Sequence, residues 1–214
     1  MKLFGIAGYS GSGKTTLIER LLPRMRTLGL RVSVLKHAHH DFDIDRPGKD
    51  SFRHRQAGAS EVLLASGARW VLMHELHGAR EPTLDEYVAH FSPCDLVLVE
   101  GYKHEPIPKL EVYRPANGKP PLWPEQPHIV AVASDQQPPA KLRGDLLWLD
   151  LNATEPIVRF ILETVQLGDQ KKTSPNSDEW TFLPKQLLPL QGGGWEGDEA
   201  NGHGFHDPGC LTQP

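Results

Sequence analysis

Nine residues near the start of the chain, residues 8–16, have the composition of a phosphate-binding loop. They read GYSGSGKTT and fit the pattern G-x-x-x-x-G-K-[ST] at every fixed position. Glycines let the backbone turn with positive φ, so that several N–H groups can point at one anion. Lys14 would reach the β- and γ-phosphates of a nucleotide, and the hydroxyl of Thr15 would hold Mg²⁺. The expected nucleotide contacts are Gly8, Ser10, Gly11, Ser12, Gly13, Lys14, Thr15 and Thr16.

The segments that flank this loop are those that a nucleotide site requires. The apolar run at residues 3–7 predicts a strand before the loop. Apolar residues spaced by three and four predict a helix after it, which ends at Gly29. The N-terminus of such a helix favours phosphate through its free N–H groups and its dipole. A glycine turn without a ligand is the alternative, and this strand–loop–helix context favours the nucleotide site.

Strand-like and helix-like segments alternate along the rest of the chain up to about residue 167. Further strands are expected at 31–37, 61–66, 68–75, 95–101, 109–114, 128–134 and 146–151, and further helices at 51–58, 83–91 and 154–167. The continuous apolar runs LVLV and IVAVA are typical of parallel strands that helices cover on both faces. The pattern therefore predicts an α/β protein with the three-layer P-loop NTPase fold and a mostly parallel sheet.

The composition of the chain changes after about residue 167. Residues 1–167 are expected to form the nucleotide-binding domain, and residues 168–214 an irregular C-terminal extension rich in glycine and proline. The extension contains GGGWEGDEANGHG, which has no periodicity and little apolar surface to offset the entropy of ordering. We expect a mobile segment or one that docks on a partner, for which the apolar residues 180–190 are the candidate.

Bulk composition narrows the classes of partner. A net charge of −4 and a pI near 6.2 argue against broad attraction to nucleic acid or anionic membrane. No apolar run approaches the roughly 18 residues that span a bilayer, and the N-terminus has no signal-peptide pattern. Cys94 and Cys210 lie far apart and form no C-x-x-C pair. We therefore expect a cytoplasmic, reduced protein that binds neither nucleic acid nor membrane.

Acidic residues in two places could complete a magnesium site. Glu100 closes the buried strand DLVLVEG, and side chains at the carboxyl ends of parallel strands face the ligand crevice. A strand-end surface acid is the alternative for this residue. Asp50, which precedes a short helix, is the second candidate for Mg²⁺, directly or through water. The predicted metal site thus comprises Thr15, Asp50 and Glu100.

A long polar segment, residues 36–59, follows the second strand and is expected to emerge near the phosphates. Its basic residues Lys36, Lys49 and Arg53, together with Lys103, are candidates for binding phosphates or a second anionic ligand. An ion-pair network within the segment explains them almost as well. The histidines of HAHHDFD offer zinc ligands, but they lack the defined tetrahedral set that zinc usually requires. A solvated polar loop is therefore favoured over a zinc site.

Three separated motifs, in order, resemble the MobB family of molybdopterin-guanine dinucleotide biosynthesis adapter proteins. The motifs are GYSGSGKTTL, VLKHAHHDFDIDRPGKDSFRHRQAGA and LVLVEGYKHEPIPKLEVYR, and the similarity covers about residues 1–165. The resemblance implies a GTP-binding homodimer with weak hydrolysis that assists the guanylyltransferase joining GMP to molybdopterin. It also implies association with proteins that insert molybdenum. It carries over residues 8–16 as the phosphate site and Asp50 and Glu100 as the acidic motif positions.

The base preference depends on a single candidate acid. Guanine is often read by the Asp of an N/T-K-x-D motif, and here Asp135 follows the strand HIVAVA without the Asn-Lys portion. A buried carboxylate can discriminate strongly, because the wrong base leaves it unpaired. A plain turn residue before QQPP is an equal alternative for Asp135. The motifs alone indicate a nucleotide, and the resemblance indicates GTP.

Three functions are compatible with these residues. The first is a GTP-binding adapter that is at most a slow GTPase, since no residue is placed by its pattern to orient the attacking water. The second is a small-molecule kinase in which the basic segment 36–55 holds an acceptor and Asp43, Asp45 or Asp50 accepts a proton; an arginine-rich lid that would exclude water is missing. The third is a binding scaffold whose nucleotide stabilises one interface geometry.

Overall fold

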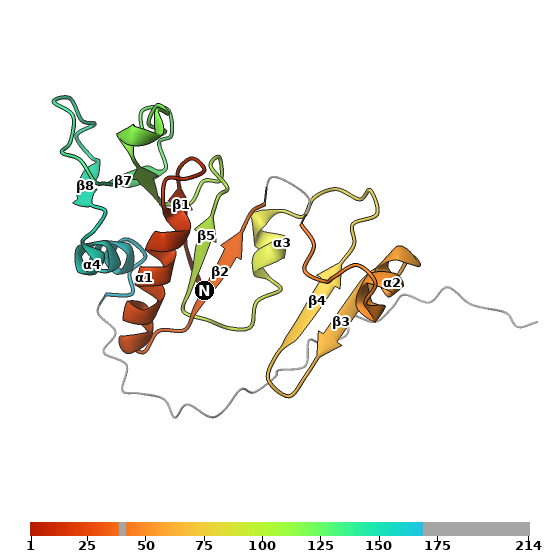
Figure 1. Cartoon of the computed structure of the whole chain (residues 1–214). Coiled ribbons are helices and arrows are strands. Elements are labelled where there is room, and N and C mark those ends of the chain that lie inside the picture. The colour runs from red at the N-terminus through yellow and green to blue at the C-terminus, as the bar shows by residue number, and fades with distance from the viewer. Residues whose placement is uncertain (39–41, 169–214) are drawn as a thin grey trace, which may run out of the picture. The chain divides into compact units, whose positions relative to one another are not determined.

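A six-stranded parallel sheet forms the centre of the protein in the computed structural model, which describes residues 1–38 and 42–168. The strand order is β2-β5-β1-β6-β7-β8, and every neighbouring pair is parallel. The strands are β1 (Lys2–Ala7), β2 (Val32–Lys36), β5 (Leu96–Glu100), β6 (Lys109–Tyr113), β7 (Ile129–Ser134) and β8 (Leu147–Asp150). The expected mostly parallel sheet is confirmed (Figure 1). Strand β1 lies between β5 and β6, so the loop that follows β1 leaves from the middle of the sheet.

Two helices cover one face of this sheet. They are α1 (Lys14–Thr27) and α4 (Thr154–Thr164), and they lie beside each other (Figure 1). Their apolar stripes pack on alternate residues of the strands, among which Phe4, Ile6 and Leu98 are fully buried. The stripe of α1 is Leu17, Ile18, Leu21 and Met25, and that of α4 is Ile157, Val158, Ile161 and Leu162. The spacing of three and four read from the sequence therefore marks the buried faces correctly.

The other face carries α3 (Leu84–Val88). Val97 and Val99 point to this side, whereas Leu96 and Leu98 belong to the first core cluster, as the period of two in a strand requires. Thr83 caps α3: its hydroxyl accepts the N–H of Glu86, and the Glu86 carboxylate accepts the N–H of Thr83. Helices thus lie on both faces of the sheet, which confirms the three-layer prediction.

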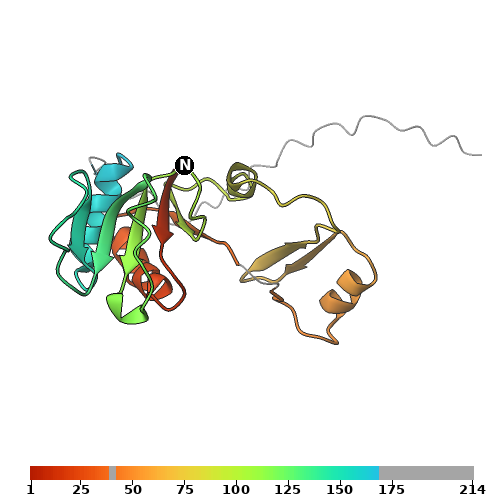
Figure 2. The same ribbon diagram turned by 90° about the horizontal axis from the view of Figure 1, so that it is seen from above.

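Strands β3 (Glu61–Ala65) and β4 (Trp70–His74) form a separate two-stranded antiparallel sheet (Figure 2). Both strands were expected, but their pairing with each other was not. The reason is the connection of four residues, 66–69, since so short a link joins only antiparallel neighbours. The Ser66 hydroxyl donates to the carbonyl of Arg69 and accepts the N–H of Arg69, which closes the turn. The short helix α2 (Asp50–Gln56) contacts β3.

Some predictions concern residues that the structure does not describe. The apolar candidate segment 180–190 and nearly all of the predicted extension 168–214 lie outside the described residues, as do His39 and His40. The division at residue 167 stays a prediction. In the described part of the chain, no helix has the length and hydropathy needed to cross a bilayer.

Candidate functional site

The loop between β1 and α1 has the backbone of a phosphate cradle. Gly8, Gly11 and Gly13 have φ values of 137°, 79° and 97°, which side chains strongly disfavour. At Gly8 the space is also closed, because an added Cβ would lie 2.6 Å from the carbonyl oxygen of Val112 and 2.8 Å from Oγ of Ser12. Gly13 is the N-cap of α1 in a left-handed conformation, so the loop leads directly into the N-terminus of the helix. This arrangement suits an anion.

Lys14 folds back across the loop that it follows. Its Nζ donates a hydrogen bond to the carbonyl oxygen of Tyr9 at 2.9 Å. Burial lowers the pKa of Lys14, Glu100 acts in the opposite direction, and the charges of Lys103 and Lys36 lower it further. The ammonium is thus partly desolvated at the mouth of α1, where a bound phosphate would restore the solvation that it has lost.

A buried hydroxyl in the same loop also lacks a partner. Ser12 is 2% exposed, and within residues 1–38 and 42–168 its Oγ has no hydrogen-bond partner. Buried polar atoms are normally satisfied, so an unpartnered hydroxyl in this glycine loop fits a site that is completed by a ligand oxygen. The loop residues therefore fit a nucleotide phosphate chain.

Thr15 and Glu100 come together as the sequence predicts for a metal site. The Thr15 hydroxyl donates to Oε1 of Glu100 at 3.3 Å, and the Glu100 side chain is 9% exposed. The β1–β5 register places Glu100 opposite Ile6, two residues before the loop begins. A hydroxyl and a carboxylate are hard oxygen ligands of the kind that Mg²⁺ prefers. The two residues thus fit the metal of a nucleotide complex.

Two of the four candidate anion contacts converge on this site. Lys36 Nζ lies 3.7 Å from Oε1 of Glu100, at the end of β2. Lys103 Nζ lies 4.7 Å from the ring centroid of Tyr9, which belongs to the phosphate loop. Both charges lower the pKa of Lys14, so the three ammonium groups lie close enough to act on one another. The net positive field at the loop favours a polyanionic ligand.

The remaining candidates from the polar segment lie on α2 or at its start. Lys49 is the N-cap of α2, and Arg53 contacts Asp50 at 3.9 Å within the same helix. The side chains of Arg53 and Asp50 are 75% and 89% exposed. The contacts described for Asp50 include neither Thr15 nor Glu100, so its place as a metal ligand stays a prediction, as do the anion roles of Lys49 and Arg53.

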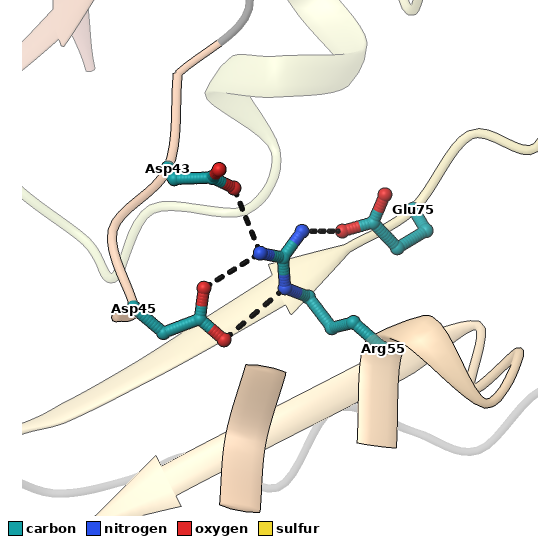
Figure 3. A network of polar contacts seen from close by, with 4 residues as sticks. All are labelled: Asp43, Asp45, Arg55 and Glu75. Carbon is teal, nitrogen blue, oxygen red and sulfur yellow. Dashed lines mark hydrogen bonds and ion pairs between the residues drawn. The ribbon is translucent and has the colours of Figure 1, made fainter. Parts of the chain in front are cut away.

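Arg55 organises the rest of the polar segment (Figure 3). Its guanidinium donates to Asp43 at 2.7 Å, to Asp45 at 2.6 and 3.2 Å, and to Glu75 at 2.7 Å. The bonds to Asp45 lower its pKa, and the four bonds together join residues 43–45 to α2 and to the end of β4. An ion-pair network was one of the two predicted explanations for the basic residues. Within the described residues, no group of three His, Cys, Asp or Glu side chains forms a metal site.

Asp135 lies directly after β7, where a base-reading acid was expected, and it is paired with Arg114. Nη1 of Arg114 donates to Oδ2 of Asp135 at 3.1 Å, and Nε of the same residue donates to the Ser12 carbonyl at 3.1 Å. Sequence reasoning named Arg114 only as the last residue of a strand. The signal was nevertheless present, because the carboxyl-end rule that selected Glu100 on β5 applies equally to the residue that follows β6.

A family model described as MobB, molybdopterin guanine dinucleotide synthesis protein B, matches residues 3–135. The molybdopterin-guanine dinucleotide biosynthesis adapter protein of Escherichia coli is 41% identical over 167 residues, which are 77% of this chain and 93% of that protein. The chain belongs to the MobB family. The MobB relative of the same description from Haemophilus influenzae is 44% identical over 162 residues, or 74% of this chain and 86% of that protein.

Solved MobB structures share the fold. A crystal structure of molybdopterin-guanine biosynthesis protein B matches with a TM-score of 0.59 at 30% identity, and the match covers 75% of this chain and 98% of that one. The crystal structure of Bacillus subtilis MobB matches with a TM-score of 0.61 at 23% identity over 77% and 98% of the two chains, which supports the fold alone. MobB proteins are nucleotide-binding P-loop proteins, in agreement with the loop described above.

Proposed function

We propose that the chain binds Mg²⁺–GTP and acts as an adapter in molybdenum cofactor biosynthesis, where it assists the attachment of GMP to molybdopterin. Membership of the MobB family supports the pathway, because its relatives are described as molybdopterin-guanine dinucleotide biosynthesis adapter proteins. The observation that carries the nucleotide part is the contact between Thr15 and Glu100 beside the glycine loop and Lys14. This contact places together the three kinds of group that a nucleotide–metal complex needs: backbone donors, a cation and oxygen ligands.

The loop residues have distinct roles in this proposal. Backbone N–H groups of residues 8–16 would hold the phosphate oxygens, and Lys14 would exchange its bond to the Tyr9 carbonyl for the β- and γ-phosphates. Thr15 and Glu100 would hold Mg²⁺, which supplies charge neutralisation between the phosphates. Lys36 and Lys103 would add longer-range attraction. Asp135 would accept the N1 and N2 donors of guanine.

We propose that GTP hydrolysis is slow. Glu100 contacts Thr15 of the loop and Lys36, and both contacts suit a metal ligand better than a base that activates water. Fast phosphoryl transfer to water requires a group that orients the nucleophile. The bound nucleotide would therefore persist for many seconds, as suits an adapter whose GTP-bound form is recognised by a partner.

The partners that we propose are a second copy of the chain, the guanylyltransferase and a molybdenum-insertion protein, all in the cytoplasm. The hairpin β3–β4 supports the homodimer. Residues of alternate position form one exposed face that is rich in apolar side chains, with Leu63, Ala65, Trp70 and Leu72 exposed. Such a face marks a protein interface. Sedimentation equilibrium should show a dimer that is lost in Leu63→Ser/Leu72→Ser; an unchanged dimer would place the interface elsewhere.

One titration tests the central proposal. Purified protein is titrated with GTP, ATP and molybdopterin, each with Mg²⁺ and with EDTA, by isothermal calorimetry. We expect GTP to bind more tightly than ATP and Mg²⁺ to strengthen the binding of GTP. A preference for ATP would contradict the role of Asp135, and the absence of any nucleotide binding would contradict the proposed function as a whole.

The kinase alternative is not carried forward, because two of its proton acceptors already have partners. Asp43 and Asp45 are bound to the guanidinium of Arg55, and the Asp45 side chain is 5% exposed. Carboxylates held in this way are not positioned to take a proton from an acceptor hydroxyl, and the bonds from Arg55 lower the pKa of Asp45, which makes that role less favourable. Product analysis with labelled GTP should show free phosphate, with no label on molybdopterin.

A further inference from the structure

We propose that Arg114 is a positioning residue for base selection, which holds the carboxylate of Asp135 against the phosphate loop. The inference rests on the proposed function, because it takes Asp135 as the acceptor for guanine. It assigns to Arg114 a task in nucleotide recognition that it performs through another side chain rather than by touching the ligand.

The guanidinium of Arg114 bridges two segments that would bind opposite ends of one nucleotide. Nε donates to the carbonyl oxygen of Ser12 in the phosphate loop, and Nη1 donates to Oδ2 of Asp135, each at 3.1 Å. The two acceptors lie 123 positions apart in the sequence (135 − 12). A planar fork with fixed donor directions can make both bonds at once, and its geometry then fixes one segment relative to the other.

Strand register puts Arg114 in this place. Strands β6 and β7 are parallel, and Tyr113 is opposite Ser134. Arg114 and Asp135 are the residues that directly follow these two strands, so they leave the sheet side by side. The guanidinium also lies along the start of α1, because a Cβ added to Gly13 would be 3.6 Å from Nε and 3.8 Å from Nη2. The position of Arg114 is therefore set by β6, β7 and α1.

Arg114 supplies a cation that the last residues of β7 do not. In the N/T-K-x-D pattern a lysine stands two residues before the aspartate, and here that residue is Ala133, which is 0% exposed. Ser134 is also buried, and its hydroxyl accepts the N–H of Gln136. The positive partner of the base-reading acid thus comes from the neighbouring strand.

The pair leaves the carboxylate able to read guanine. Arg114 occupies one lone pair of Oδ2, and a carboxylate offers about four acceptor positions on its two oxygens. The side chains are 39% and 29% exposed, so a bound base would bury them further. Guanine donates from N1 and N2, whereas adenine presents an acceptor at N1, which would leave the fixed carboxylate unpaired. Without Arg114 the carboxylate could rotate away, and discrimination would decrease.

The test separates base selection from phosphate binding. Dissociation constants for GTP, ATP and inorganic triphosphate, all with Mg²⁺, are measured for the wild type, Arg114→Ala, Asp135→Ala and the double variant. We expect Arg114→Ala to weaken GTP binding about tenfold, as the loss of a charge-assisted hydrogen bond does, and to change ATP and triphosphate binding less than about twofold. The double variant should bind GTP as Asp135→Ala does, because Arg114 acts through Asp135.

The conservative variant and a matched control sharpen the result. Arg114→Lys, which lacks the planar fork, should keep an intermediate GTP to ATP ratio. Arg159→Ala removes an exposed arginine on α4 and should leave all three constants unchanged. An equal loss of affinity for GTP, ATP and triphosphate in Arg114→Ala would overturn the inference, because it would mean a role in the phosphate loop itself. An unchanged GTP to ATP ratio would also overturn it.

Failure of the proposed function would look different. A wild type that prefers GTP, beside an Arg114→Ala variant with the same preference, would reject this inference alone. A wild type that binds triphosphate but does not prefer GTP would reject the guanine role of Asp135, and the inference with it. A wild type that binds none of the three ligands would reject the nucleotide site.

Discussion

The hydroxyl of Thr15 lies 3.3 Å from Oε1 of Glu100, and this contact joins the start of α1 to the end of β5 across 85 residues of sequence. Lys36 Nζ approaches the same oxygen at 3.7 Å. The contact exists because β1 and β5 are neighbours in the sheet and both end at the edge where the glycine loop begins. Two oxygen atoms of the kind that Mg²⁺ prefers and one ammonium group therefore lie together at this edge of the sheet.

Replacing Glu100 by glutamine should remove the magnesium dependence of nucleotide binding. The amide keeps the shape of the side chain but has no negative charge for the metal, so the gain in GTP affinity on adding Mg²⁺ should decrease by roughly tenfold or more. Affinity in EDTA should not decrease, because the carboxylate is no ligand of the phosphates. Calorimetric titration with and without Mg²⁺ measures both values.

Glu125→Gln is the matched control for this experiment, since Glu125 is exposed and lies outside the site. It should keep the full effect of Mg²⁺. If Glu100→Gln also keeps the full effect, the metal is held by other residues, and Glu100 is the strand-end surface acid of the alternative interpretation.

Lys14→Ala should weaken GTP binding without destabilising the fold. The Lys14 ammonium is partly desolvated, and it donates to the Tyr9 carbonyl within the loop. Removal of the ammonium should therefore leave the sheet intact, while GTP affinity falls by about ten- to a hundredfold. The yield of molybdopterin guanine dinucleotide with purified guanylyltransferase should fall in parallel. Lys119→Ala, at an exposed position, serves as the control. Full adapter activity without GTP binding would reduce the nucleotide to a structural ligand.

Most of the site could be predicted because its information is local. The glycine pattern specifies a cradle over nine residues, and Glu100 is recognisable as the acid that ends a fully buried apolar strand. Thr15 follows from the same loop. Each of these residues is identified by its immediate neighbours, and the parallel-sheet rule then brings the two strand ends together.

What escaped prediction depends on partners far along the chain. Arg114 contacts Asp135 because the register of β6 and β7 places Tyr113 opposite Ser134. The sequence of either strand alone does not determine this register. The segments 61–66 and 68–75 were both expected as strands, but their antiparallel pairing with each other was not recognised from the short turn between them. An ion-pair network within the polar segment was one of two predicted explanations, but the contact of Arg55 with Glu75, which was expected only as the end of a strand, was not foreseen.

Arg55→Met should loosen the segment from residue 43 to residue 75. Three carboxylates that share one guanidinium would then repel each other with no charge to compensate them. Amide hydrogen exchange over α2 and the hairpin should become faster at pH 7, while that of β1 and β5 should stay as in the wild type. Arg53→Met is the control on the same helix, because Arg53 is exposed and lies 3.9 Å from Asp50.

The effect of Arg55→Met should also depend on pH. Arg55 lowers the pKa of Asp45 in the folded protein, so the ionised pair adds to the free energy of unfolding at pH values above the ordinary aspartate pKa. This contribution is lost as the pH falls through the lowered pKa of Asp45. Wild type and variant should therefore converge in acid. Arg55→Lys should give an intermediate exchange rate, because an ammonium keeps the charge but cannot reproduce the fork of four bonds. Equal exchange in Arg55→Met and the wild type at pH 7 would show that the network is incidental.

The free energy of unfolding should increase as the pH rises above 8, because Lys109 loses its proton in the folded protein before it does so in the unfolded chain. The side chain is 0% exposed, and its Nζ donates to the carbonyls of Glu105 and Ile107, while its stem packs on Gly5. Burial lowers its pKa to about 8, against 10.5 for the free side chain. Between these values the unfolded chain binds more protons than the folded one, so the free energy of unfolding increases with pH, by on the order of 2 kcal/mol across the window.

The comparison with Lys109→Met isolates this contribution. Urea unfolding at pH 7.5 and pH 10 gives the free energy of unfolding for each protein, and titrations common to both cancel in the difference. The wild type should gain stability relative to Lys109→Met over this range, whereas Lys119→Met, which removes an exposed lysine, should follow the wild type. Parallel curves for the wild type and Lys109→Met would mean that the ammonium is solvated in the folded protein. The charge of Lys109 would then carry no desolvation cost.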